Sequence, residues 1–128
     1  MGNRCVITDT KKTRAIYQHW NGGRDTIEPL LKVAKELGKG FDSVIEISAK
    51  VFGGEAASYY EVDVDNGDNG VYIIDDDLDI IGREFFEWKE QDYYNPHEME
   101  IFIRLTYELG DSEKVETLMN LVEKIKGE

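Results

Sequence analysis

The sequence predicts an α+β domain in which an antiparallel sheet packs against about four helices. Two stretches before residue 21 are rich in β-branched and aromatic residues, and apolar and polar residues alternate from residue 60, as both do in strands. The segments between and after these stretches repeat apolar residues every three or four positions, as helices do. The expected order is ββαα-βββ-αα in a single domain, residues 1–128.

The chain is expected to begin with a β-hairpin. Its strands are Arg4–Thr8 and Arg14–Trp20, and the polar residues 9–13 join them. The two glycines of Asn21–Gly23 then end the second strand, because adjacent glycines favour a turn.

Two helices should follow this hairpin. The first runs from about Thr26 to Leu37, with Pro29 in its first turn and Gly38 as its C-cap. The second spans Asp42–Phe52 and ends at a further pair of glycines, Gly53–Gly54.

A three-stranded meander is expected next. Tyr60–Asp65 alternates as a half-buried strand does, and Asn66–Gly70 is the strongest hairpin signal in the chain. Val71–Ile74 forms the return strand, Asp75–Asp77 a second turn and Leu78–Ile81 the third strand. The middle strand is apolar on both faces, so other elements should cover both of them.

The C-terminal part predicts two more helices. Asn95 caps the first of them and Pro96 takes its first position, a combination typical of helix starts. Gly110 ends that helix, Asp111 or Ser112 begins the last one, and its apolar stripe runs from Val115 to Ile125.

The composition favours a cytosolic protein that binds neither nucleic acid nor membranes directly. Lysine and arginine total 15 against 27 aspartates and glutamates, which gives a net charge of −12. Phosphates and anionic lipids repel such a charge, whereas basic protein surfaces attract it.

The chain has one cysteine, Cys5, so it cannot form an intrachain disulfide, and we expect Cys5 to be a buried apolar residue. No apolar run reaches membrane-spanning length.

An acidic block is the strongest functional feature. No lysine or arginine occurs between Val51 and Gly82, although nine carboxylates do. One hypothesis is a partner-binding surface that partly mimics DNA, because Glu61, Asp63 and Asp65 on one strand face would lie about 7 Å apart, as successive phosphates do. The alternative is an ordinary solvated face with turn residues. The candidate partner-binding residues are Glu61, Asp63, Asp65, Asp68, Asp75, Asp76, Asp77 and Asp79.

The same block does not fit an EF-hand. With Gly70 at the sixth position of the loop, Gly67 falls at the third position, where an oxygen ligand is needed, and no glutamate falls at the twelfth. We therefore expect no metal site, and only a looser cation site among Asp63, Asp65 and Asp68 stays open.

A second candidate site is the loop Trp20, Asn21, Gly22, Gly23 and Arg24. Glycines before a helix can direct backbone amides at an anion, and Arg24 could assist. The loop matches neither a Walker A nor a dinucleotide fingerprint. The structural alternative is a tight connection in which Trp20 packs and Arg24 pairs with a carboxylate.

Signatures of catalysis are scarce. His19 and His97 are the only histidines, and with Cys5 they cannot form an ordinary zinc site. His97 should be exposed in the first turn of its helix. We expect no catalytic residue, no cofactor and no enzymatic activity.

Three segments resemble a family of small, mostly uncharacterised proteins of phages and mobile elements of Gram-positive bacteria. They are Gly2–Ile7, His19–Asp25 and Asp65–Ile74 with Ile81–Arg83. The resemblance implies a counter-defence role, such as an anti-CRISPR protein, and carries no active site. It leads to the expectation of an acidic inhibitor that occupies a basic surface of a nucleic-acid-handling host protein, most concretely a Cas9-type effector. The alternatives are a small-ligand or nucleotide-binding domain using the Trp20–Arg24 loop, and a housekeeping interaction module.

Overall fold

The computed structural model describes residues 3–86, 96–110, 116–121 and 124, and it confirms the α+β class and the expected order of elements. Residues 116–121 are helical, whereas Asn95 and residues 111–115, which include the start of the last expected helix, lie outside the described residues. The elements are β1 (Cys5–Thr8), β2 (Arg14–Gln18), α1 (Arg24–Leu37), α2 (Phe41–Phe52), β3 (Glu55–Ser58), the 3-10 helix η1 (Tyr59–Glu61), β4 (Val71–Ile74), β5 (Ile80–Glu84) and α3 (Pro96–Leu109).

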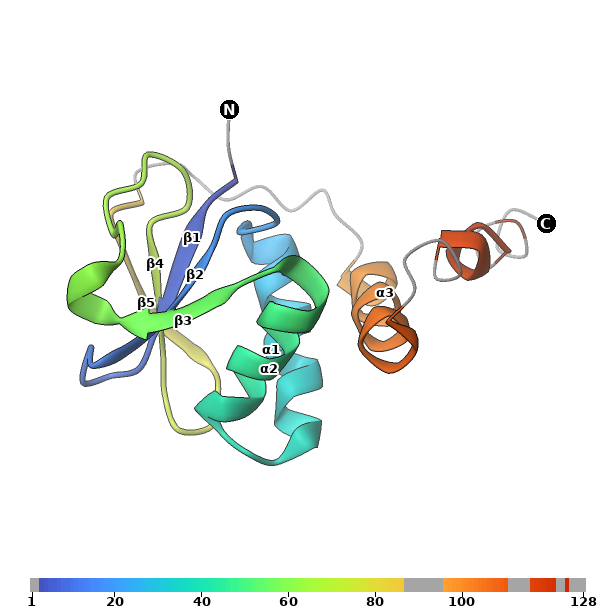
Figure 1. Ribbon diagram of the computed structural model, residues 1–128, viewed down its shortest axis with the longest axis horizontal. Helices are drawn as coiled ribbons and strands as arrows, with labels where there is room; N and C mark the ends of the chain where they lie inside the picture. Colours follow the sequence, from blue (N-terminus) through green and yellow to red (C-terminus); the bar gives the residue numbers. More distant parts are fainter. Residues whose placement is uncertain (1–2, 87–95, 111–115, 122–123, 125–128) are drawn as a thin grey trace.

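The five strands form one mixed sheet in the order β3-β2-β1-β4-β5 (Figure 1). Three neighbouring pairs are antiparallel, but β1 and β4 run parallel, with Val6 opposite Val71 and Thr8 opposite Ile73. The prediction of a wholly antiparallel sheet is therefore wrong at this pair. The physical reason is the connection between β3 and β4: it crosses the sheet past β2 and β1 instead of turning back beside β3.

This connection, residues 59–70, is called the crossover below, and it replaces the strand predicted at Tyr60–Asp65. Residues 62–69 have no regular secondary structure, and the third strand lies earlier, at β3. Val62 and Val64 are partly buried against Val6 and Val71 on the sheet face, while Glu61, Asp63 and Asp65 are exposed. Alternating burial thus arises here from a chain lying on an apolar surface, without the hydrogen bonds of a strand.

The two predicted turns of the meander differ in outcome. Asn66–Gly70 leads from the crossover into β4 and joins no antiparallel pair, so the prediction of a hairpin there is wrong. The turn at Asp75–Asp77 does join the antiparallel strands β4 and β5. Leu78 lies outside the strand, at a φ of 63°, because its side chain turns into the core.

Helices α1 and α2 cover the other face of the sheet, so both faces of β4 are buried, as expected. Gly38 ends α1 in the left-handed conformation, which confirms the predicted C-cap. Helix α1 begins at Arg24, two residues earlier than expected, so Pro29 lies beyond the first turn. The main core contains Cys5, Ile7, Ile16, Ile27, Leu30, Val44, Ile47, Tyr72 and Ile74.

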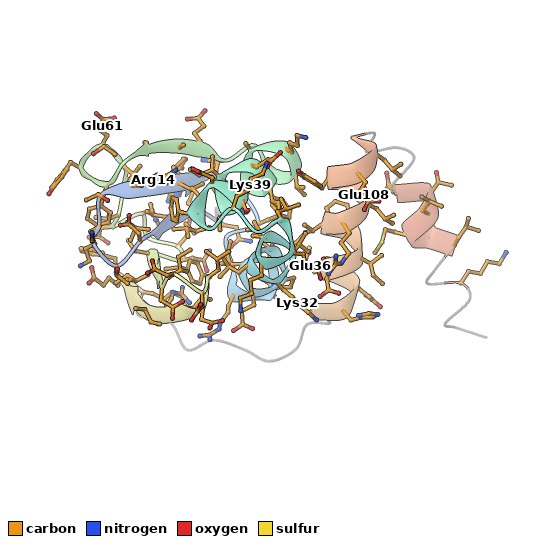
Figure 2. The ribbon with its side chains drawn as sticks, turned by 90° about the horizontal axis from the view of Figure 1, so that it is seen from below. Arg14, Lys32, Glu36, Lys39, Glu61 and Glu108 are labelled. Atoms are coloured by element: carbon orange, nitrogen blue, oxygen red, sulfur yellow. The ribbon has the colours of Figure 1, made fainter. Side chains whose placement is uncertain are left out.

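Helix α3 packs on the outer side of α1 and α2, with Ile103 wholly buried (Figure 2). Ion pairs surround this apolar contact: Lys32 lies 2.8 Å from Glu100, and Arg104 pairs with Glu36. Pro96 is the first residue of the helix and His97 is exposed, both as predicted. None of the helices among the described residues is long and apolar enough to cross a membrane.

Candidate functional site

The three segments that carried the family resemblance meet at one end of the sheet. Strands β1 and β4 begin there and β2 and β5 end there, so Asn3–Arg4, His19–Gly23, Asn66–Gly70 and Glu84 are brought together (Figure 1). We call this the motif end. The β1–β2 turn, residues 9–13, and the β4–β5 turn, residues 75–79, lie at the opposite end.

A dense polar network closes the motif end. Asp68 accepts hydrogen bonds from the backbone amide and the Nε of Arg4, at 3.1 and 2.7 Å. The Asn69 amide group donates to the Asn3 side chain at 2.6 Å, and Arg83 donates to the Asn69 carbonyl at 2.6 Å. The hydrogen bond from the Arg4 guanidinium lowers the pKa of Asp68, which burial alone would raise. Asp68 therefore serves the fold and is not available to a partner.

The candidate ligand loop at Trp20–Arg24 is held by the same network. A side chain at Gly22 would lie 2.5 Å from the Asn3 carbonyl oxygen and 2.8 Å from the Cβ of Cys5, so the close approach to β1 requires glycine. Gly22 also donates to the Asn3 carbonyl at 2.8 Å and accepts from the Tyr72 hydroxyl at 2.7 Å. The glycine thus has a structural role, and Arg24 pairs with Glu28 at 2.5 Å, as the structural alternative predicted.

Trp20 departs from that alternative, which expected it to pack. Its side chain is 55% exposed. It contacts the exposed ring of His19 edge-on at 4.6 Å between centroids, and His19 shares a 2.8 Å hydrogen bond with the Tyr17 hydroxyl. The reason is the strand alternation: Ile16 and Gln18 of β2 face the helices, so Tyr17 and His19 face away from them and Trp20 lies past the end of the strand. No pattern in the sequence indicates this exposure.

The predicted partner-binding carboxylates fall into three groups, and one of these, Asp75–Asp77, lies in the β4–β5 turn with Asp76 and Asp77 exposed. Asp79 pairs with Lys35 of α1 at 2.5 Å, and Asp68 pairs with Arg4, so both act within the molecule. Neither cation partner was identified from the sequence, because each lies more than forty residues away. Glu61, Asp63 and Asp65 are exposed on the crossover, and no ion pair within the described residues involves them. Since they do not lie on a strand, the predicted spacing of about 7 Å along one strand face does not apply to them.

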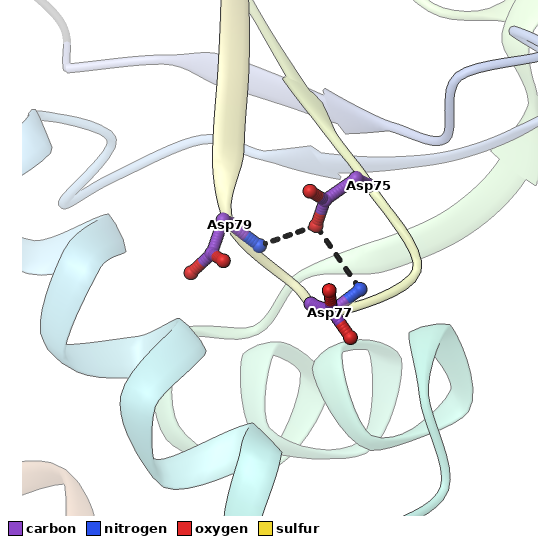
Figure 3. Close-up of side chains that lie close together, drawn as sticks. All are labelled: Asp75, Asp77 and Asp79. Atoms are coloured by element: carbon purple, nitrogen blue, oxygen red, sulfur yellow. Dashed lines mark hydrogen bonds between the residues drawn. The ribbon is translucent and has the colours of Figure 1, made fainter.

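Asp75, Asp77 and Asp79 lie close together in the β4–β5 turn (Figure 3). One oxygen from each lies within 4.8 Å of the others, which would allow a cation to bind. The Asp75 carboxylate already accepts hydrogen bonds from the backbone amides of Asp77 and Asp79, at 3.0 and 2.9 Å. The group differs from the cation site left open by the sequence, which comprised Asp63, Asp65 and Asp68.

The structure keeps the few reactive side chains apart. Cys5 is wholly buried, as predicted, and burial raises the pKa of its thiol to about 12, which leaves it un-ionised at neutral pH. His19 lies at the motif end and His97 in the first turn of α3. The Cys5 side chain lies in the core on the helix side of the sheet, whereas His19 bonds with Tyr17 on the other side.

No family model, curated protein or solved structure matches this chain. The function proposed below therefore rests on the charge and geometry of the chain and on the resemblance of its three segments to proteins of phages and mobile elements.

Proposed function

We propose that this protein is a non-enzymatic binding protein that blocks a basic surface of a nucleic-acid-handling host protein, most concretely a Cas9-type effector. In this proposal it acts in the bacterial cytosol on behalf of a phage or mobile element, and it partly mimics DNA. The centre of its binding surface is the exposed outer side of the crossover, with Glu61, Asp63 and Asp65.

The observation that carries the proposal is how the molecule uses its cations. Most of the described lysines and arginines are already paired inside the molecule, at the motif end, along the sheet and between the helices. The exposed carboxylates of the crossover, Glu61, Asp63 and Asp65, belong to none of these pairs within the described residues. Glu61 points outward on the side of the molecule opposite α3 (Figure 2). The electrostatic potential of such unpaired carboxylates speeds association with a basic surface. Added salt screens this attraction and weakens the binding.

The test uses a purified Cas9-type effector loaded with its guide RNA. Binding of a fluorescent target duplex is followed by anisotropy while this protein is added at low and at high salt. We expect the protein to displace the duplex at low salt and to do so much less at high salt. Unchanged duplex binding at both salt concentrations would exclude the Cas9-type effector as the partner. The same competition experiment would then be run with basic nucleic-acid-binding proteins of the host.

Two matched variants locate the contact. Glu61→Gln with Asp63→Asn and Asp65→Asn removes three charges from the crossover, and Asp75→Asn with Asp76→Asn and Asp77→Asn removes three from the β4–β5 turn. We expect the crossover variant to lose at least tenfold in affinity and the turn variant to lose little. Equal losses would show that only net charge matters, and no loss in either variant contradicts the proposed function.

A further inference from the structure

The exposed Trp20 is held in place by buried polar groups. Gln18 is wholly buried, and its amide group donates to the carbonyls of Trp20 and Asn21, at 2.9 Å each. Its oxygen accepts from the hydroxyl of Ser48, which is wholly buried on α2, at 2.7 Å. Burying an amide and a hydroxyl costs free energy unless both are hydrogen-bonded. Because the Gln18 amide finds its acceptors in the Trp20 and Asn21 carbonyls, these bonds fix the backbone that carries the indole.

The backbone that follows is also fixed. Asn21 has a φ of 58°, a backbone conformation that residues other than glycine adopt only at a cost in free energy. Gly22 forms hydrogen bonds with Asn3 and with the Tyr72 hydroxyl. The loop is thus ordered before any partner arrives. An exposed tryptophan on an ordered backbone loses little conformational entropy on binding, which is the property of an interface anchor.

The indole is continuous with the acidic crossover. Tyr17 lies between them: its hydroxyl bonds with His19, and its ring packs on the apolar patch that Val62 and Val64 also cover. Asp63 is the exposed residue between Val62 and Val64, so it lies next to the patch on which Tyr17 packs. Burial raises the pKa of Tyr17, Arg4 opposes this, and the charge of Asp63 raises it further. The row Trp20, His19, Tyr17 and Asp63 therefore forms one surface, with an aromatic end and an anionic end.

We infer that Trp20 anchors a protein partner by stacking on an arginine side chain of a basic surface, while Asp63 and its neighbours face the surrounding cations. This inference rests on the proposed function and names the group that the partner supplies. Arginine fits both ends, because its planar guanidinium stacks on aromatic faces and pairs with carboxylates, whereas the more strongly hydrated ammonium of lysine stacks less well.

The test is a titration of the full chain with a short peptide of alternating glycine and arginine, followed by heteronuclear NMR, with the lysine peptide in parallel. The chain has two tryptophans, so a Trp20→Phe variant identifies the Trp20 indole signal. We expect the arginine peptide to shift that signal together with the amides of residues 61–65, and to bind more tightly than the lysine peptide. Trp20→Ala should weaken arginine-peptide binding about threefold to fivefold, the effect of an exposed cation–π contact.

Phe85→Ala is the matched control. Phe85 is 48% exposed and follows β5, so β1 and β4 separate it from the Trp20 loop. We expect this variant to bind the arginine peptide as tightly as the unaltered chain does. An equal loss of affinity in Phe85→Ala and Trp20→Ala would overturn the inference, because it would show that the peptide binds any exposed aromatic ring. Amide shifts at the crossover without a shift of the Trp20 indole would overturn the inference and leave the proposed function standing. Binding that survives in the crossover triple variant would contradict the proposed function instead.

Discussion

Asn66–Gly70 and Asp75–Asp79 are both rich in aspartate, and turns were predicted in both, but they are held in different ways. Asn66–Gly70 bonds with residues more than sixty positions away, through Asp68 with Arg4 and through Asn69 with Asn3. Asp75–Asp79 makes its turn bonds within itself, through the backbone and the carboxylate of Asp75. Turn composition therefore identifies where the chain bends, whereas the fold decides whether the bend connects neighbours or distant segments.

Among the substitutions that test this difference between the two turns, replacing Gly70 should lower the free energy of unfolding most. Gly70 has a φ of 64°, and a side chain there would collide with the carbonyl oxygens of Glu84 and Phe85. We expect Gly70→Ala to lower the free energy of unfolding by about 3 kcal/mol or more. Gly53→Ala is the control, because Gly53 has a φ of 70° with open space around it, and it should cost about 1 kcal/mol in urea denaturation. Equal losses would show that backbone strain alone accounts for the effect.

Asn66 should come next. It is buried, its oxygen accepts from the amides of Asp68 and Gly70 at 3.1 Å each, and its nitrogen donates to the Asp63 carbonyl at 3.1 Å. Asn66→Ala leaves the buried Gly70 amide and the partly buried Asp68 amide and Asp63 carbonyl without this partner, and it should cost about 2–3 kcal/mol, measured by urea denaturation. The variant should also weaken peptide binding, since the crossover would lose its order at Asp63. A loss under 1 kcal/mol would show that the long-range bonds of Asp68 and Asn69 hold this loop without the Asn66 side chain.

The pair between Arg4 and Asp68 should appear as a pH dependence. Because the folded state lowers the pKa of Asp68, the group stabilises the fold above its unfolded pKa, about 3.9. That contribution is lost as the pH falls through the lower, folded value. We expect Asp68→Asn to be less stable than the unaltered chain at neutral pH, with the difference shrinking below about pH 4 in acid titrations followed by circular dichroism. A constant difference across this range would exclude an electrostatic cause.

Asp75 should give the smallest effect. Asp75→Ala removes an acceptor for two backbone amides in an exposed turn, where water can replace it, so we expect a loss of about 0.5–1 kcal/mol. The free energies of unfolding of Asp75→Ala and Asn66→Ala are measured in parallel by urea denaturation. The two values can be compared directly, because each substitution removes one side chain that organises one turn. Equal losses would show that the two turns do not differ in how they are held.

Predictions from the sequence were most successful for local structure. The end of α1 at Gly38, the start of α3 at Pro96 and the turn between β4 and β5 depend on residues a few positions apart. The strand at Tyr60–Asp65 was wrong, since an alternating pattern arises wherever a chain lies along an apolar surface. For the candidate site, the sequence located the acids, but it did not indicate that Asp68 and Asp79 are paired within the molecule.

By itself the sequence determined the α+β class, the order of elements, the burial of Cys5 and the excess of negative charge. Composition, periodicity and capping residues are local properties, and they were enough for these. Only the tertiary structure decided that β1 and β4 pair in parallel, that Asp68 is taken up by Arg4, and that Trp20 is exposed beside the crossover. These depend on contacts between segments far apart in the chain, because the side chain that neutralises a charge or covers a ring is supplied by whichever segment the fold places beside it.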